Sequence, residues 1–191
     1  MRFEKSIRWE SHASFNLSGQ MRIIISSAFI QITFGLRKHR LRDFESIRVV
    51  ARAYSYLWNE EFYHGDVNLS LSRITLAWPA VAKGFNIPDD SMNLCIHEFS
   101  HCLALQERVS IFYSFFNPVS WSYFKDIAHE NLVRVKAGES KVLRKYGGTN
   151  WMEFFSVAME TFFENPKKMA LHEPKIYQVL VRLLNQDPLG R

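Results

Sequence analysis

Apolar residues recur along the first part of the chain with two different periods, which predict a helix and several strands. From Ser18 to about residue 38, isoleucine, alanine and leucine recur at every fourth position, and Ser18 can cap the helix that this spacing predicts. In residues 46–54 and 67–78, apolar side chains recur at every second position and would share one face of an extended chain. This alternation is typical of half-buried strands or a hairpin. The polar stretch 59–66 contains a glycine and predicts a loop.

The rest of the chain has the period of helices. Asp90 or Ser91 can cap one helix, and Asn150 can cap another that ends before Pro166. A longer helix between them ends at the glycine pair 147–148, either in one piece or in two pieces that meet near Gly138. The predicted helices cover residues 18–38, 90–106, 120–146, 150–164 and 174–184.

The order of the predicted strands and helices indicates an α+β domain in which a small sheet packs on a mainly helical body. Hydrophobic residues make up 47% of the 191 residues and charged residues 23%, as in ordinary globular proteins. We expect residues 1–191 to form a single domain that folds without disulfides. The longest apolar run, residues 23–36, is interrupted by polar side chains and is too short to span a bilayer. No membrane association is therefore expected.

The two cysteines, Cys95 and Cys102, lie seven positions apart in one predicted helix. Their Cα atoms would be about 10 Å apart at about 1.5 Å per residue. A disulfide bridges at most about 7 Å between Cα atoms, so both are expected to be free thiols. Free thiols, together with the absence of a recognisable cleavage site for secretion, favour the cytoplasm.

The net charge is +5, and the basic residues are most concentrated in one short stretch. This stretch could contact an acidic partner, or it could be the solvated end of a helix, where cations suit the helix dipole. No nucleic-acid motif accompanies it, so we favour the solvated helix end and expect no nucleic-acid partner. The residues are Arg37, Lys38, His39, Arg40 and Arg42.

The central chemical signal is the pentapeptide His97-Glu98-Phe99-Ser100-His101, an H-E-x-x-H pattern. Residues four apart on a helix lie on the same face, so both imidazoles can reach one metal ion. Glu98 lies on the neighbouring flank, where it can act on a water at the metal without binding the metal itself. The pattern predicts a zinc site in which His97 and His101 are ligands and Glu98 is the general base.

A catalytic zinc needs a third protein ligand, and the residues directly after His101 do not supply one. The helix 150–164 carries three acids. Glu160 lies in its apolar middle, where an unpaired carboxylate is costly, so a metal or an arginine such as Arg134 or Arg144 must compensate it. Glu153 falls three residues after Asn150, where it can close a capping box, and Glu164 is expected to be solvated.

Several segments in the same order resemble the zinc peptidases of the Mlc titration factor A family. These are the motif region 97–103, the segment 153–166 (EFFSVAMETFFENP), the tail 172–188 and the region 76–84. The resemblance extends over most of the chain, from about residue 17 onward. It implies a zincin-like metallopeptidase fold of the gluzincin type and one Zn²⁺ per chain.

The resemblance also implies site residues and activity. His97, His101 and Glu160 would be the zinc ligands and Glu98 the general base of a cytoplasmic, aminopeptidase-like enzyme acting on peptides or proteins. One departure is Ala104, where the family commonly has an aspartate that can support a ligand. An alternative follows from the family's association with a transcriptional repressor: a zinc-containing interaction protein that binds a regulator with little or no hydrolysis.

Tyr146 is the candidate for a second catalytic group. It lies just before the turn at residues 147–148, where a phenol could donate to the oxyanion that forms during hydrolysis, although a core tyrosine explains it equally well. The aromatic stretch 112–124 can either wall a substrate cleft or pack in the core.

Overall fold

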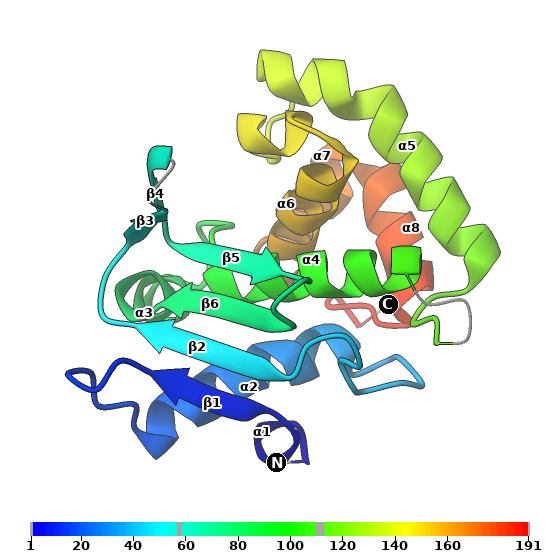
Figure 1. The fold of residues 1–191 in the computed structure, drawn as a ribbon. Helices are drawn as coiled ribbons and strands as arrows, with labels where there is room; N and C mark the ends of the chain where they lie inside the picture. The colour runs from blue at the N-terminus through cyan, green and yellow to red at the C-terminus, as the bar shows by residue number, and fades with distance from the viewer. Residues whose placement is uncertain (1, 57–58, 110–112, 191) are drawn as a thin grey trace.

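The computed structural model describes residues 2–56, 59–109 and 113–190, and its centre is a mixed sheet (Figure 1). Strands follow the order β1-β2-β6-β5; β1, β2 and β6 are parallel, and β5 runs antiparallel to β6 at one edge. A separate hairpin, β3–β4, projects from the body next to that edge. The strands are β1 (Arg8–Ser11), β2 (Ser46–Val50), β3 (Tyr54–Tyr56), β4 (Asn59–Tyr63), β5 (Gly65–Asn68) and β6 (Arg73–Ala77).

Helices make up most of the remaining structure. Figure 1 shows α2 beside β1 and β2, and α5 to α8 grouped beyond α4. Helix α4 is central because it packs against α2, β5 and α6. The helices are α1 (Arg2–Ser6), α2 (Gly19–Thr33), α3 (Trp78–Asn86), α4 (Leu94–Val109), α5 (Pro118–Ala137), the 3₁₀ turn η1 (Lys145–Gly148), α6 (Trp151–Glu164), α7 (Pro166–His172) and α8 (Pro174–Leu184). The predicted α+β class is confirmed.

Two predicted helix starts are confirmed by their caps. The hydroxyl of Ser18 accepts a hydrogen bond from the Met21 N–H at 3.2 Å. The Asn150 side chain accepts hydrogen bonds from the N–H groups of Met152 and Glu153, at 2.9 and 3.0 Å. Each cap satisfies donors that a helix start otherwise leaves without a partner.

Helix α2 ends at Thr33, earlier than the apolar pattern predicted. At Gly35 the backbone runs against the end of α8, so that a Cβ atom would lie 2.3 Å from the carbonyl oxygens of Leu184 and Asn185. The contact with α8 therefore explains why the helix stops here, and the local pattern of apolar residues gives no sign of that contact. The basic cluster, residues 37–42, lies in the loop that follows and not at a helix end, and Lys38 and Arg42 each lie 4.4 Å from the ring centre of Tyr113.

Other predictions of local structure were wrong in boundaries or type. The stretch 59–66, predicted as a loop, forms β4 and the start of β5, because β4 pairs with β3 and β5 pairs with β6. Helix α4 begins at Leu94, and the side chain of Asn93 accepts the Ile96 N–H at 3.2 Å. Helix α5 ends at Ala137 and is capped by Gly138, whose φ of 81° is left-handed, so the break offered near Gly138 is present; α7 was not predicted.

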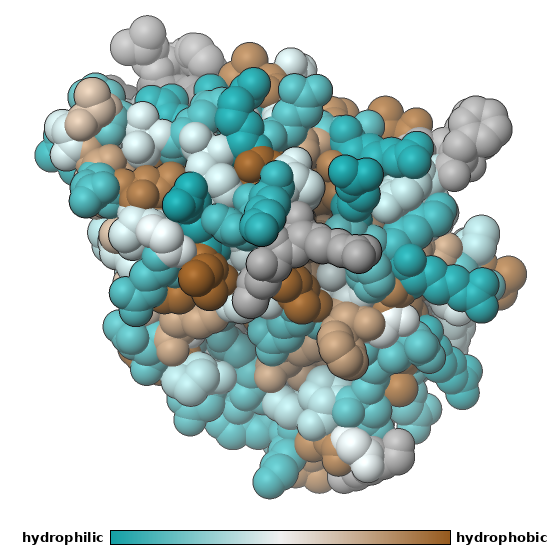
Figure 2. Space-filling view, turned by 90° about the horizontal axis from the view of Figure 1, so that it is seen from below, coloured by the Kyte–Doolittle hydropathy of each residue, from teal (hydrophilic) through white to brown (hydrophobic). Residues whose placement is uncertain are grey.

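The buried apolar side chains form one cluster that runs from Phe3 to Leu184. In the described part of the aromatic stretch, Phe116, Trp121 and Phe124 make edge-to-face contacts with Phe155 of α6, with ring centres 5.1–5.9 Å apart. These rings pack in the core and do not wall a cleft; residue 112 lies outside the described residues. Hydrophilic side chains predominate on the face in Figure 2, and hydrophobic ones lie between them in small groups. Among the described residues no helix is long and apolar enough to cross a membrane.

Candidate metal centre

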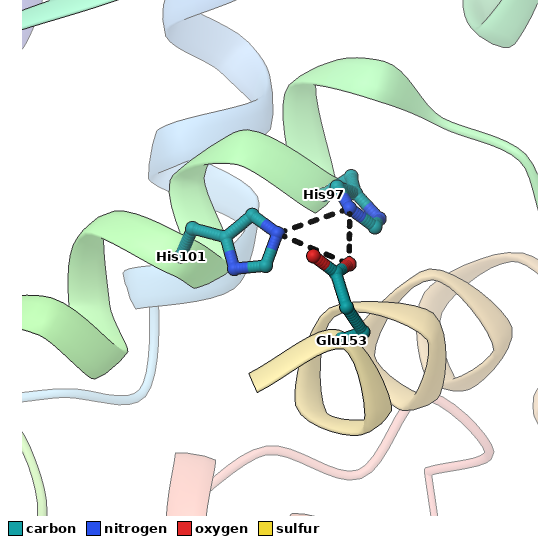
Figure 3. A group of neighbouring side chains, drawn as sticks. All are labelled: His97, His101 and Glu153. Atoms are coloured by element: carbon teal, nitrogen blue, oxygen red, sulfur yellow. Dashed lines mark hydrogen bonds and ion pairs between the residues drawn. The ribbon is translucent and has the colours of Figure 1, made fainter. Parts of the chain in front are cut away.

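Helices α4 and α6 bring three metal-ligating side chains together (Figure 3). His97 and His101 lie one turn apart on α4, and their Nε2 atoms are 3.1 Å apart. The Oε2 atom of Glu153, from the first turn of α6, lies 3.1 Å from the Nε2 atom of His97 and 3.3 Å from that of His101. Of the residues that the structure describes, these three form the one group with the spacing of a metal site.

The separations suit a tetrahedral ion. Nitrogen and oxygen ligands about 2.0–2.1 Å from a tetrahedral zinc lie about 3.3 Å from one another, close to the separations between these donors. The Oε2 atom of Glu153 is buried and accepts no hydrogen bond from the described residues. A buried carboxylate oxygen without a donor is costly, and a cation at the centre of the triangle would compensate it. The donor set therefore fits zinc.

Glu160 occupies a different position from the one expected of a ligand. Its Oε1 atom lies 2.7 Å from Nδ1 of His97, on the side of the ring away from Nε2, and its Oε2 atom accepts the Asn93 N–H at 2.7 Å. Arg144 donates to the same carboxylate. Glu160 thus has the arginine partner that was the alternative to metal binding, and the structure does not bring it into the group formed by His97, His101 and Glu153.

The contact between Glu160 and His97 has a chemical consequence. A carboxylate can only accept a hydrogen bond, and each nitrogen of the His97 ring faces one, which favours the charged ring when no metal is bound. With a metal on Nε2, the ring would be neutral and its hydrogen would be on Nδ1, where Glu160 accepts it. The Nε2 atom is the one that faces His101 and Glu153. A carboxylate behind a ligating histidine commonly fixes the ring in this way.

Burial and charge act in opposite directions on the ionisable groups. Burial alone would lower the pKa of His97, but contacts with Glu153 and Glu160 raise it to about 10. Burial alone would raise the pKa of Glu153, but its contacts with His101 and His97 hold it well below its usual range. The pKa of Glu98 is raised by burial, against the attraction of the two imidazoles. These side chains are therefore largely shielded from water, and for that reason their charges interact strongly.

Glu98 is buried beside the histidines and below strand β5. At Gly65, the first residue of β5, a Cβ atom would lie 2.4 Å from the Oε1 atom of Glu98. The glycine is thus required by close approach, because any side chain there would displace the carboxylate. Strand β5 holds Glu98 at the edge of the sheet next to the metal-binding group.

Tyr146 lies in η1, with its ring centre 6.0 Å from that of His97. Its side chain is 52% exposed, so it is not the core tyrosine of the alternative explanation. Partial burial and the neighbouring Glu153 raise the pKa of Tyr146 to about 12, which keeps the phenol protonated at neutral pH.

A cleft of about 600 Å³ opens beside the metal-binding group. Its walls come from β4, β5, α3, the start of α4, the segment around η1 and α6. His97, Glu98 and Tyr146 all face it. Their common exposure to one cleft gives a substrate access to the site.

Two acids on α6 differ from their predicted roles. Glu153 was assigned to a capping box, but its side chain points to the histidines, and Asn150 caps the helix without it. Glu164, predicted to be solvated, is half-buried and accepts the Met92 N–H at 3.0 Å, and burial raises its pKa to about 7. Glu153 and Glu160 are seven residues apart and so share one helix face, and the sequence alone does not decide which of them reaches the metal.

Ala104, the departure from the expected family pattern, is buried in the apolar cluster. A charged side chain there would need a partner in the core. The support that an aspartate could give to a ligand is therefore absent at this position, and in this chain the carboxylate next to His97 comes from Glu160.

The fold and the site together define a zincin-like metallopeptidase-type protein: a mixed sheet with an antiparallel edge strand lies over a helix that carries H-E-x-x-H. The chain belongs to the family described as glucose-regulated metallo-peptidase M90, whose family model matches residues 1–184.

Individual relatives agree with this assignment. The chain is 25% identical over 197 aligned residues to the Synechocystis sp. protein slr2042, an alignment that covers 92% of this chain and 70% of the relative. It is 31% identical to Mlc titration factor A of Serratia proteamaculans and 28% identical to that of Yersinia pestis, in each case over 62% of this chain. The matched region spans about half the length of the Mlc titration factor A proteins, 47% and 46%.

Replacing Glu153 and Glu160 of α6 one at a time by glutamine distinguishes the expected zinc ligand, Glu153, from the supporting residue, Glu160. We expect Glu153→Gln to abolish stoichiometric zinc binding, because it replaces a donor of the triangle. Glu160→Gln should weaken zinc binding by about 10- to 100-fold, the usual effect of altering a group behind a ligand.

Zinc titrations of the two variants, with Glu164→Gln on the same helix as a control, measure this difference. Substitution with Co²⁺ gives a second readout, since Glu160→Gln should keep the absorption bands of a tetrahedral ion. The assignment is wrong if Glu153→Gln holds the metal as tightly as the parent while Glu160→Gln loses it.

Proposed function

We propose that this chain is a zinc-dependent peptidase. The observation that carries the proposal is the triangle of His97 Nε2, His101 Nε2 and Glu153 Oε2, which has the donor types and spacing of a zinc site and lies beside a cleft. These three residues would hold the ion. Bound zinc supplies Lewis acidity, which polarises a peptide carbonyl and makes a water acidic enough to attack it.

Glu98 acts as the general base in this proposal. Its carboxylate faces the cleft next to His97 but is not part of the triangle. Burial raises its pKa, which suits a carboxylate that takes a proton from the attacking water and returns it to the leaving amine. Gly65 allows the carboxylate to keep this position.

Two further residues support the reaction. The phenol of Tyr146, which stays protonated at neutral pH, can donate a hydrogen bond to the oxygen of the carbonyl as negative charge develops there. Glu160 is a positioning residue, because its contact with Nδ1 keeps the Nε2 lone pair of His97 turned toward the centre.

The wider setting of the proposal is one catalytic domain over residues 1–191, acting on a peptide or protein substrate in an aminopeptidase-like manner. The apolar cluster that runs from Phe3 to Leu184 through the described residues supports one domain. A cytoplasmic location is supported by Cys95 and Cys102, both of which are buried free thiols.

A second candidate function rests on the name of the relatives. Mlc titration factor A is named for another protein, Mlc, and a chain of this family could act by binding a regulator instead of by hydrolysis. In that case the zinc site would be a scaffold. Peptide hydrolysis that a chelator abolishes and zinc restores would decide for the peptidase.

Removal of the base tests the proposed enzyme directly. We expect Glu98→Gln to lower peptide hydrolysis by about 100-fold or more, the usual scale for a general base, and to keep zinc bound. Turnover of a panel of fluorogenic peptides and the zinc content of the same preparations measure both effects. Glu130→Gln, which changes an exposed side chain of α5, is the control. Unchanged turnover in Glu98→Gln would remove Glu98 from the mechanism.

Loss of a single hydroxyl tests the oxyanion donor. We expect Tyr146→Phe to lower kcat by about 10-fold or more with little change in KM, because its hydrogen bond forms only as charge develops. Zinc content and the unfolding midpoint should stay at the parent values. Tyr123→Phe, an exposed tyrosine of α5, serves as the control, and equal kcat in both variants would give Tyr146 no role in the reaction.

A further inference from the structure

The cleft beside the metal-binding group carries two basic side chains on separate walls. Lys83 comes from the last turn of α3, and Arg144 comes from the segment before η1. Apolar side chains, among them Pro79, Met92 and Leu94, line the space that they share. Such a combination of apolar walls with a few polar groups is the usual make-up of a ligand site.

Lys83 brings a positive charge that no ion pair among the described residues neutralises. Its side chain is exposed to the cleft, and it forms no ion pair with any residue in the described part of the chain. A lysine that is free on the wall of a concave site attracts negatively charged groups into that site.

Arg144 brings hydrogen-bond donors that remain unused. One of its terminal nitrogens, Nη2, donates to Glu160. Its Nε atom is buried and has no hydrogen-bond partner among the described residues. A guanidinium has five N–H donors in a fixed plane, so pairing with one carboxylate oxygen leaves donors for a second oxyanion.

Each of the three acids that line the cleft is in contact with other described residues. Glu160 is already shared between His97 and Arg144. Glu98 is the proposed base and lies buried below Gly65. Glu61, on β4, accepts a hydrogen bond from the Tyr63 hydroxyl at 3.3 Å.

We infer that this cleft recognises a carboxylate of the substrate close to the scissile bond, with Lys83 supplying the attraction and Arg144 the hydrogen bonds. The group is either the C-terminal carboxylate of a short peptide or the side chain of an aspartate or glutamate. The inference rests on the proposed peptidase function, since it names the class of substrate for the same site.

One set of peptides distinguishes the two sources of the carboxylate. Alanine dipeptides and tripeptides, whose C-terminal carboxylate lies close to the scissile bond, are compared with their C-terminal amides. Amidated peptides with one aspartate are compared with their asparagine counterparts at each position. We expect kcat/KM to be about 5- to 10-fold higher for the carboxylate member of one pair, as for one partly solvated charge contact. Equal kcat/KM in every pair would overturn the inference and leave the peptidase function standing.

Charge reversal on the cleft wall tests the residue assignment. Lys83→Glu should abolish or invert the preference, because it replaces the attracting charge by a repelling one. Lys168→Glu, which makes the same change on exposed α7, should keep the preference of the parent. Retention of the preference in Lys83→Glu would contradict the assignment.

Binding gives a readout that does not need turnover. The same peptide pairs are titrated into zinc-loaded Glu98→Gln protein, and the ratio of their Kd values is compared with and without Lys83→Glu. Tighter binding of the carboxylate peptides that depends on Lys83 supports the inference even if the parent hydrolyses no peptide, a result that would contradict the proposed function alone. Equal Kd values within every pair would contradict the inference.

Discussion

The close approach of two imidazole nitrogens and one carboxylate oxygen is the constraint on which the rest of the structure depends. These three atoms lie 3.1–3.3 Å apart, in a place where the carboxylate oxygen has no hydrogen-bond donor. Without a metal, the pKa of about 10 gives His97 a positive charge at neutral pH, and this charge compensates the two carboxylates that face its ring. A bound metal ion would take over this role and displace the proton, which couples metal binding to the fold and to pH.

The surrounding elements meet this constraint from several sides. The Ser156 hydroxyl, on α6, donates to the carbonyl oxygen of His97 at 3.1 Å and so ties the two helices together next to the site. The aromatic rings around Phe155 anchor the opposite face of α6 in the core. Strand β5 covers the carboxylate of Glu98, which lies in close contact with the backbone at Gly65. The supports are thus a hydrogen bond, a packed core and a close backbone contact.

The sequence predicted those features that depend on neighbouring residues. The caps at Ser18 and Asn150 and the common face of His97 and His101 follow from local spacing. The features that it did not predict depend on distant segments. Strand β4 exists through its pairing with β3, and the end of α2 is set by contact with α8. The roles of Glu153 and Glu160 depend on how α6 is rotated toward α4, which helical periodicity leaves open. The buried polar position of Glu160 correctly indicated a special role, but its partners are His97 and Arg144.

Anomalous diffraction at the zinc edge, on crystals of the zinc-loaded chain, tests the central claim most directly. The account predicts one strong peak about 2 Å from Nε2 of His97, Nε2 of His101 and a carboxylate oxygen of Glu153. Glu160 should remain on Nδ1 of His97. A peak coordinated by Glu160 in place of Glu153, or no peak between the two histidines, would contradict it.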